Sequence, residues 1–203
     1  MIDNFDSVKT LLHFDENTNI FFHCIITQRG KDGKPNKLIQ TYLIRSVKHL
    51  ESLKKEITLL CEHYQARAYI NVAGKSFEKV NKAVLVKLAN EVYSNNIYFI
   101  SPEKLLGSTI GEVKSEFPRW IVDIDDMSIK DQVIEWLDNY FYIEEPPHFY
   151  PRNYYLKATV PTVHGCHLIV TPFSLLDFNK EFPNVTVLKN NGTLLYYPDS
   201  LSD

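Results

Sequence analysis

Hydrophobic residues follow two different periods along this chain, and the period indicates which segments form strands and which form helices. Alternating or continuously apolar segments bounded by Gly, Pro, Asn or Ser predict β-strands. Such strands are expected at residues 19–30, 38–46, 66–74, 95–101, 119–125, 154–162, 166–173 and, in two halves, 185–198. The first two strands flank KDGKPNK and the last two flank Asn191-Gly192, so each pair is predicted to form a hairpin.

Apolar residues spaced three or four positions apart predict helices between these strands. The helices are expected at 47–64, at 76–95, for one or two turns after Ser101-Pro102, and at 128–141. Ser46 and Ser76 are the expected caps of the first two helices. This order predicts an α/β or α+β fold, with a mixed β-sheet and flanking helices. A weaker apolar pattern near 100–118 separates an N-terminal α/β part, 1–100, from a lobe at 101–203, although both could form one continuous domain.

Composition narrows the class of protein without naming a function. The 203 residues are 44% hydrophobic and 23% charged, which suits one sizeable core or two small joined lobes. The net charge of −3 indicates no global basic field, although a local basic groove is compatible with it. Three cysteines without metal-like spacing suggest reduced thiols in a cytoplasm. No segment approaches the ~20 apolar residues that span a bilayer, so no membrane partner is expected.

The segment RWIVDIDDMS carries the strongest chemical signal. Asp123 and Asp125 alternate with Ile124 on an expected strand, so both carboxylates should point to one face while Ile124 enters the core. Adjacent carboxylates repel each other unless a cation lies between them, and Mg²⁺ or Mn²⁺ prefers such oxygen ligands. The alternative is a strand that ends in a polar turn, with Asp125 or Asp126 capping the next helix.

A second signal lies in TVHGCHLIVTPF. Gly165 permits a tight turn or a close approach to a ligand, and His167 opens an apolar strand, where its imidazole could donate to a phosphate oxygen. A histidine satisfied within the core is the alternative. His164 and His167 could also bind a metal, but no third ligand is near them in the sequence.

Together these motifs resemble those of the archaeo-eukaryotic primase superfamily, which includes the primase–polymerases of plasmids and phages. The resemblance covers residues 119–200, with a hydrophobic-D-x-D motif at 123–125 and a small-G-x-G-x-H motif at 162–167. It implies a primase-like catalytic lobe with an RRM-like sheet, in which Asp123 and Asp125 hold Mg²⁺ or Mn²⁺. It also implies that His167 contacts the phosphates of a nucleoside triphosphate, beside Thr162, His164 and Gly165.

The chain departs from this family pattern at two places. Val163 replaces the first glycine of the second motif. The third motif of the family is a hydrophobic residue followed by aspartate, but in the matching segment, 184–200, the leading strand 185–188 contains no aspartate. Asp177 and Asp199 are the nearest carboxylates in the sequence. A missing metal ligand argues against polymerase activity.

Arg119 and Lys189 flank the expected site and could bind phosphates, although solvated surface charge also explains either residue. The resulting hypothesis is a metal-dependent nucleotidyltransferase that acts on nucleoside triphosphates and a DNA or RNA strand. Two alternatives stay open: a nuclease or hydrolase that uses the same metal, and a degenerate protein that binds nucleotide or nucleic acid without turnover. The oligomeric state does not follow from these motifs.

Overall fold

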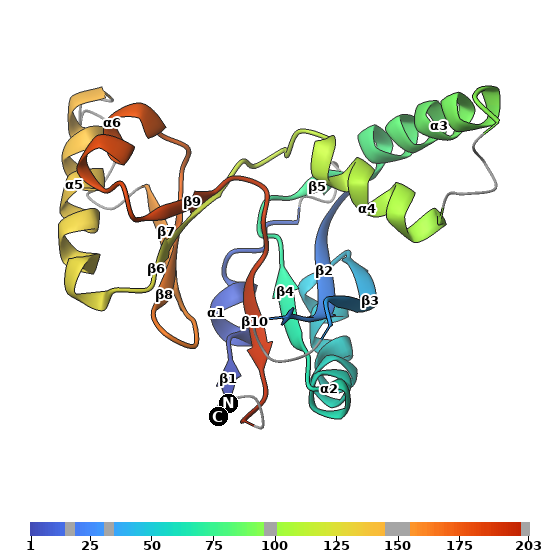
Figure 1. Ribbon diagram of the computed structural model, residues 1–203, viewed down its shortest axis with the longest axis horizontal. Coiled ribbons are helices and arrows are strands. Elements are labelled where there is room, and N and C mark those ends of the chain that lie inside the picture. Colours follow the sequence, from blue (N-terminus) through green and yellow to red (C-terminus); the bar gives the residue numbers. More distant parts are fainter. Residues whose placement is uncertain (15–18, 31–34, 96–100, 145–154, 200–203) are drawn as a thin grey trace.

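A computed structural model describes residues 1–14, 19–30, 35–95, 101–144 and 155–199. Its strands form two sheets, which Figure 1 shows side by side. The α+β class predicted from the sequence is confirmed. The prediction of a mixed sheet is wrong, because every described strand pair is antiparallel.

The first sheet has the order β1-β10-β4-β2-β3, and β5 pairs with β2 at one end. Its strands are β1 (Ile2–Asp3), β2 (Ile20–Gln28), β3 (Lys37–Ile44), β4 (Arg67–Ile70), β5 (Lys75–Ser76) and β10 (Thr193–Tyr197). The predicted hairpin of β2 and β3 is confirmed by seven paired positions between Phe22 and Gln28. Helix α2 (Val47–Tyr64) covers one face of this sheet and contributes Leu50, Ile57 and Cys61 to its core.

The second sheet has the order β7-β8-β6-β9. Its elements are β6 (Trp120–Ile124), α5 (Lys130–Glu144), β7 (Leu156–Pro161), β8 (Cys166–Val170), α6 (Leu175–Glu181) and β9 (Thr186–Leu188). This is a β-α-β-β-α-β unit in which the first strand lies between the third and the fourth, so the RRM-like arrangement is confirmed. Helices α5 and α6 lie together on its outer side in Figure 1, which leaves the other face turned toward the first sheet.

Serine caps set the start of three helices. The side chains of Ser46 and Ser76 accept hydrogen bonds from backbone N–H groups at the start of α2 and of α3 (Phe77–Tyr93), as predicted. Ser101 caps α4 (Pro102–Glu112) in the same way. Helix α4 is longer than the one or two turns expected, because Ile110 is buried against Phe21 and Val80 in a small core.

The expected hairpin at 185–198 is wrong, because its two strands join different sheets. Strand β9 pairs with β6, whereas β10 pairs with β1 and β4. The turn between them is docked on β4: a Cβ on Gly192 would lie 3.0 Å from Tyr69 Cβ, and Asn71 Nδ2 donates to the Asn190 carbonyl at 3.2 Å. Residues 101–203 therefore contribute to both sheets.

The molecule has two large cores, and one of them joins the two sheets. One extends from the first sheet, through Ile26 and Leu195, to Ile121, Val160 and Ile169 on the facing side of the second sheet. The other lies between the second sheet and helices α5 and α6. The sequence did not predict β1, α1 (Phe5–Lys9), β5 or α6, and most of the strand expected at 95–101 lies outside the described residues. Within the described ranges, no helix combines the length and the apolar character that a membrane span requires.

Candidate functional site

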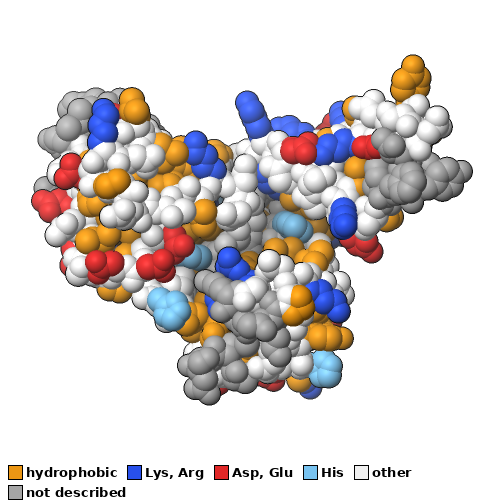
Figure 2. All heavy atoms as spheres, viewed as in Figure 1, with side chains coloured by type: hydrophobic (Ala, Val, Ile, Leu, Met, Phe, Trp, Pro, Cys, Tyr) orange, Lys and Arg blue, Asp and Glu red, His pale blue; other side chains and the backbone are white. Residues whose placement is uncertain are grey.

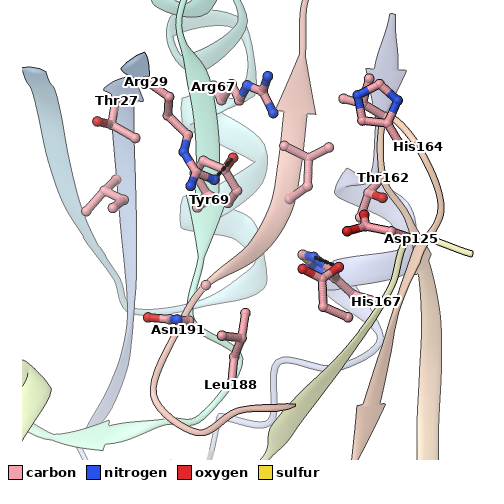
Figure 3. A pocket seen from close by; sticks show the side chains of 15 residues that line it. Thr27, Arg29, Arg67, Tyr69, Asp125, Thr162, His164, His167, Leu188 and Asn191 are labelled. Atoms are coloured by element: carbon pink, nitrogen blue, oxygen red, sulfur yellow. Dashed lines mark hydrogen bonds and ion pairs between the residues drawn. The ribbon is translucent and has the colours of Figure 1, made fainter. Parts of the chain in front are cut away.

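A cleft of about 420 Å³ lies between the open face of the second sheet and the face of the first sheet that carries Arg67 and Tyr69. Its volume falls within the range of small-molecule sites in proteins. Figure 2 shows the surface hollowed between the lobe that carries α5 and α6 and the rest of the molecule, with acidic, basic and histidine side chains gathered at the edge. In Figure 3, the side chains of both sheets point toward one another across it.

Strand β6 supplies the acidic wall of the cleft. Val122 and Ile124 are buried in the core under α5, whereas Asp123 and Asp125 both line the cleft. The expectation that the two carboxylates share a face is met, and it follows from the alternation of side chains along a strand. The next residue, Asp126, caps the short helical turn Met127–Ile129 by accepting from Ser128 N at 2.9 Å. A hydrogen bond from the Ser128 side chain lowers the pKa of Asp126.

His167 lies on β8, directly opposite Asp123 in the strand register. Its Nε2 is 3.4 Å from Asp123 Oδ1, and its Nδ1 is 2.8 Å from Thr193 Oγ1 on β10. The His167 residue is 7% exposed, so its ring lies at the floor of the cleft and touches both sheets. The convergence of Asp123, Asp125 and His167 on one cleft, which the motifs predicted, is therefore present.

The turn between β7 and β8 forms one rim of the cleft. Thr162 N donates to the Gly165 carbonyl at 2.9 Å, and Gly165 N donates to Thr162 Oγ1 at 3.1 Å. A Cβ on Gly165 would collide with the Ile124 carbonyl oxygen, so only glycine lets this turn close against the end of β6. His164 is exposed at the tip of the turn and lines the cleft.

The first sheet supplies a basic and aromatic wall that the motifs did not indicate. Arg29 follows β2, and Arg67 and Tyr69 lie on β4; all three line the cleft. Arg29 Nη1 donates to Tyr69 Oη at 3.1 Å, and the Arg67 guanidinium lies 4.6 Å from the Tyr197 ring centroid. Arg67, which is only 6% exposed, and the half-buried Tyr69 alternate with Ala68 and Ile70, so both lie on the cleft side of β4. Strand alternation explains this shared side but does not indicate that it faces the carboxylates.

Two residues expected to bind substrate lie elsewhere. Arg119 is buried, and its Nη1 donates to the Leu11 carbonyl at 2.5 Å; burial also lowers its pKa. The Lys189 Nζ lies 4.7 Å from the ring centroid of Trp120, whose side chain packs on the helix-covered face of the second sheet. Neither residue lines the cleft.

Cys166 lies beside the site but does not provide a nucleophile. Burial raises the pKa of its thiol; Lys130 opposes this rise with a smaller effect, and the Asp123 carboxylate adds a still smaller increase. A thiol with a raised pKa has little reactive thiolate at neutral pH.

No third carboxylate joins Asp123 and Asp125 among the described residues that line the cleft. Thr186 on β9 lies directly opposite Asp123, in the segment that matches the third motif of the resemblance. Asp177 forms an ion pair with Lys180 at 2.9 Å, and Asp199 pairs with the amino group of Met1. Across the described ranges, no group of three or more His, Cys, Asp and Glu side chains is arranged to hold a metal ion.

The pair still suits one kind of metal binding. Mg²⁺ is commonly bound through one or two carboxylates, with waters and substrate phosphates completing its shell. Asp123 and Asp125 provide such oxygen ligands at the wall of an open polar cleft. The donor set therefore fits a cation that is shared with a phosphate ligand better than a cation that the protein encloses by itself.

Comparisons with protein-family models, with curated proteins and with solved structures found no match. The function must therefore be inferred from the chemistry of the cleft.

Proposed function

We propose that the chain is a metal-dependent nucleotidyltransferase of primase–polymerase type, which joins nucleoside triphosphates to a nucleic-acid strand. One observation carries the proposal: two carboxylates on the second sheet face two arginines on the first sheet across one cleft. A triphosphate with its divalent cation has the matching distribution of charge, because the cation suits the carboxylates and the phosphate oxygens suit the guanidinium groups.

Each wall then has a separate role. Asp123 and Asp125 would hold Mg²⁺ or Mn²⁺, which when bound neutralises phosphate charge and favours departure of pyrophosphate. Arg29 and Arg67 would bind phosphate oxygens, and the exposed His164 would donate to the same group. In the reaction, the strand's 3′-hydroxyl oxygen bonds to the α-phosphorus, the bond to pyrophosphate breaks, and the hydroxyl proton passes to solvent.

A second candidate is a protein that binds the metal–triphosphate complex without turnover. The neutral Thr186 side chain opposite Asp123 favours this candidate, because a second metal ion would need a further carboxylate. The two candidates share the ligand and differ only in whether a nucleotide is incorporated.

Thermal melts with Mn²⁺ and a nucleoside triphosphate test whether the protein binds the metal–triphosphate complex, which both candidates require. A ligand present at one hundred times its dissociation constant stabilises the folded state by about 2.7 kcal/mol, which corresponds to roughly 5–10 °C for a chain of this size. Asp123→Asn should abolish the Mn²⁺ shift. Asp126→Asn is the matched control, because it lies three residues away, keeps a side chain able to cap, and lies outside the cleft lining.

Incorporation of a labelled nucleotide on a primed template then separates the candidates. Incorporation that disappears in Asp123→Asn supports the transferase, whereas a melting shift without incorporation supports the binding protein. Arg29→Gln should weaken the triphosphate shift and leave the Mn²⁺ shift intact. Wild-type protein that responds to neither Mn²⁺ nor triphosphate would overturn both candidates.

A further inference from the structure

Thr193 is a buried polar residue to which the motifs assign no role. It is fully buried at the start of β10, and its Oγ1 lies 2.8 Å from Nδ1 of His167. Thr193 belongs to the first sheet and His167 to the second, so this hydrogen bond joins the two sheets at the floor of the cleft.

The partners of the imidazole determine where its proton lies. An ionised carboxylate only accepts hydrogen bonds, whereas a hydroxyl can donate or accept. Because Nε2 faces Asp123, a neutral imidazole carries its proton on Nε2, and Nδ1 must then accept from the Thr193 hydroxyl. The reverse tautomer would direct the lone pair of Nε2 at a carboxylate oxygen, which is unfavourable.

We propose that Thr193 is a positioning residue for the cleft, which acts on Asp123 through His167. Asp123 sets the Nε2–H tautomer, and the Thr193 hydroxyl, which then donates to Nδ1, fixes the ring. The ring in turn orients the Asp123 carboxylate. The part that concerns metal binding rests on the proposed function, in which Asp123 is a metal ligand. The part that concerns the hydrogen bond from Thr193 to His167 does not depend on it.

The surroundings of Thr193 show why its position is well defined. The preceding turn is docked on β4 through the Asn71–Asn190 hydrogen bond and the close approach of Gly192. Thr193 itself pairs with Ile70 in the register of the first sheet. The first sheet therefore fixes the position of the Thr193 hydroxyl. Through its hydrogen bond, the hydroxyl fixes the position of the His167 ring on the second sheet. Groups that orient a metal ligand in this way commonly change metal affinity 10–100-fold when they are removed.

Three variants test the assignment. Thr193→Val keeps the shape and removes the hydroxyl, and Thr193→Ser keeps the hydroxyl. Thr109→Val is the matched control: Thr109 is also fully buried, but its hydroxyl donates to the Leu105 carbonyl within α4, away from the cleft. Each protein is labelled with ¹⁵N-histidine, and the tautomer of His167 is determined by NMR without metal. The dissociation constant for Mn²⁺ is then measured by titration.

The expected result is an Nε2–H tautomer in all four proteins, with the ¹⁵N resonance of the unprotonated Nδ1 shifted in Thr193→Val alone, because that nitrogen has lost its hydrogen-bond donor. Mn²⁺ affinity should fall about tenfold or more in Thr193→Val alone. An Nδ1–H tautomer in the wild type would overturn the proposal even if Thr193→Val failed to fold, and so would a folded Thr193→Val with the wild-type Nδ1 resonance and affinity. A wild type that has the Nε2–H tautomer but binds no Mn²⁺ would overturn the proposed function and leave the role of Thr193 in positioning His167 supported.

Discussion

At the scale of single residues, the cleft depends on contacts that leave no room for substitution. Gly165 is the clearest example, since a Cβ there would collide with the Ile124 carbonyl oxygen and lie 3.1 Å from Asp125 Cα. The side chain that glycine lacks would occupy the space in which the turn meets the acidic strand. The position of Asp125 and the conformation of the turn are therefore coupled through backbone atoms.

Gly165→Ala should destabilise the fold and displace Asp125. Forcing a methyl group into a filled site commonly costs about 1–3 kcal/mol, and here the opposing atoms belong to backbone that cannot rotate away. The measurements are the free energy of unfolding in denaturant and the Mn²⁺-dependent melting shift, both of which should decrease. Gly111→Ala is the control: a Cβ there meets nothing within 4 Å, and alanine in a helix should stabilise by about 0.5–1 kcal/mol. Equal effects of the two substitutions would contradict the steric role of Gly165.

At the scale of elements, the local sequence pattern predicted which segments form helices and strands, because this depends on neighbouring residues. It did not predict which strands pair with each other. The 47–64 helix and its Ser46 cap follow from apolar spacing and one side chain, and they are present as predicted. The alternation in RWIVDID likewise placed Asp123 and Asp125 on one face. The segment 185–198 has equally clear strand periodicity, but periodicity does not state which strand is the partner.

The same limit explains the missed half of the site. Arg29 and Arg67 come from the first sheet, and their approach to Asp123 depends on how two sheets separated by α3 and α4 in the chain pack together. Nothing in the sequence around either arginine indicates that a carboxylate lies across a cleft from it in the folded chain. Thr193 was missed for the same reason, because its partner lies on another sheet.

Strand register yields a prediction about metal binding at the element scale. Side chains directly opposite in an antiparallel pair have Cβ atoms about 4.5–5.5 Å apart, so Thr186→Asp would place a third carboxylate beside Asp123. Without metal, the added repulsion should lower the melting temperature, because like charges directly opposite are destabilising. With Mn²⁺, the stabilising shift should exceed that of the wild type. Thr186→Asn, which adds the shape without the charge, is the control, and an equal Mn²⁺ shift in both variants would refute the prediction.

At the scale of the whole molecule, the two sheets share one core, and the cleft lies at their junction. The first core includes residues from both sheets, and β10 from the C-terminal part completes the first sheet between β1 and β4. The geometry of this cleft depends on the relative position of the two sheets. A substitution that destabilises one sheet should therefore also destabilise the other.

Leu195→Ala tests this coupling, because Leu195 is fully buried on β10 in the core that includes Ile121 and Ile169 of the second sheet. Removing a buried leucine side chain costs about 2–5 kcal/mol. The two tryptophans of the chain, Trp120 and Trp136, both pack against the other core, under the second sheet, so their fluorescence reports a region outside the substituted core. In one cooperative unit, the fluorescence transition in denaturant should move to lower concentration by the same amount as the circular dichroism transition.

Leu176→Ala is the control for that measurement, since Leu176 is 71% exposed on α6 and its removal should move neither transition. A Leu195→Ala protein whose fluorescence transition stays at the wild-type midpoint, while circular dichroism shows early loss of structure, would mean that the second sheet folds independently of the first. The arginines and the carboxylates would then lie on separately stable units, and the cleft would lack the fixed geometry on which the proposed binding of a metal–triphosphate complex depends.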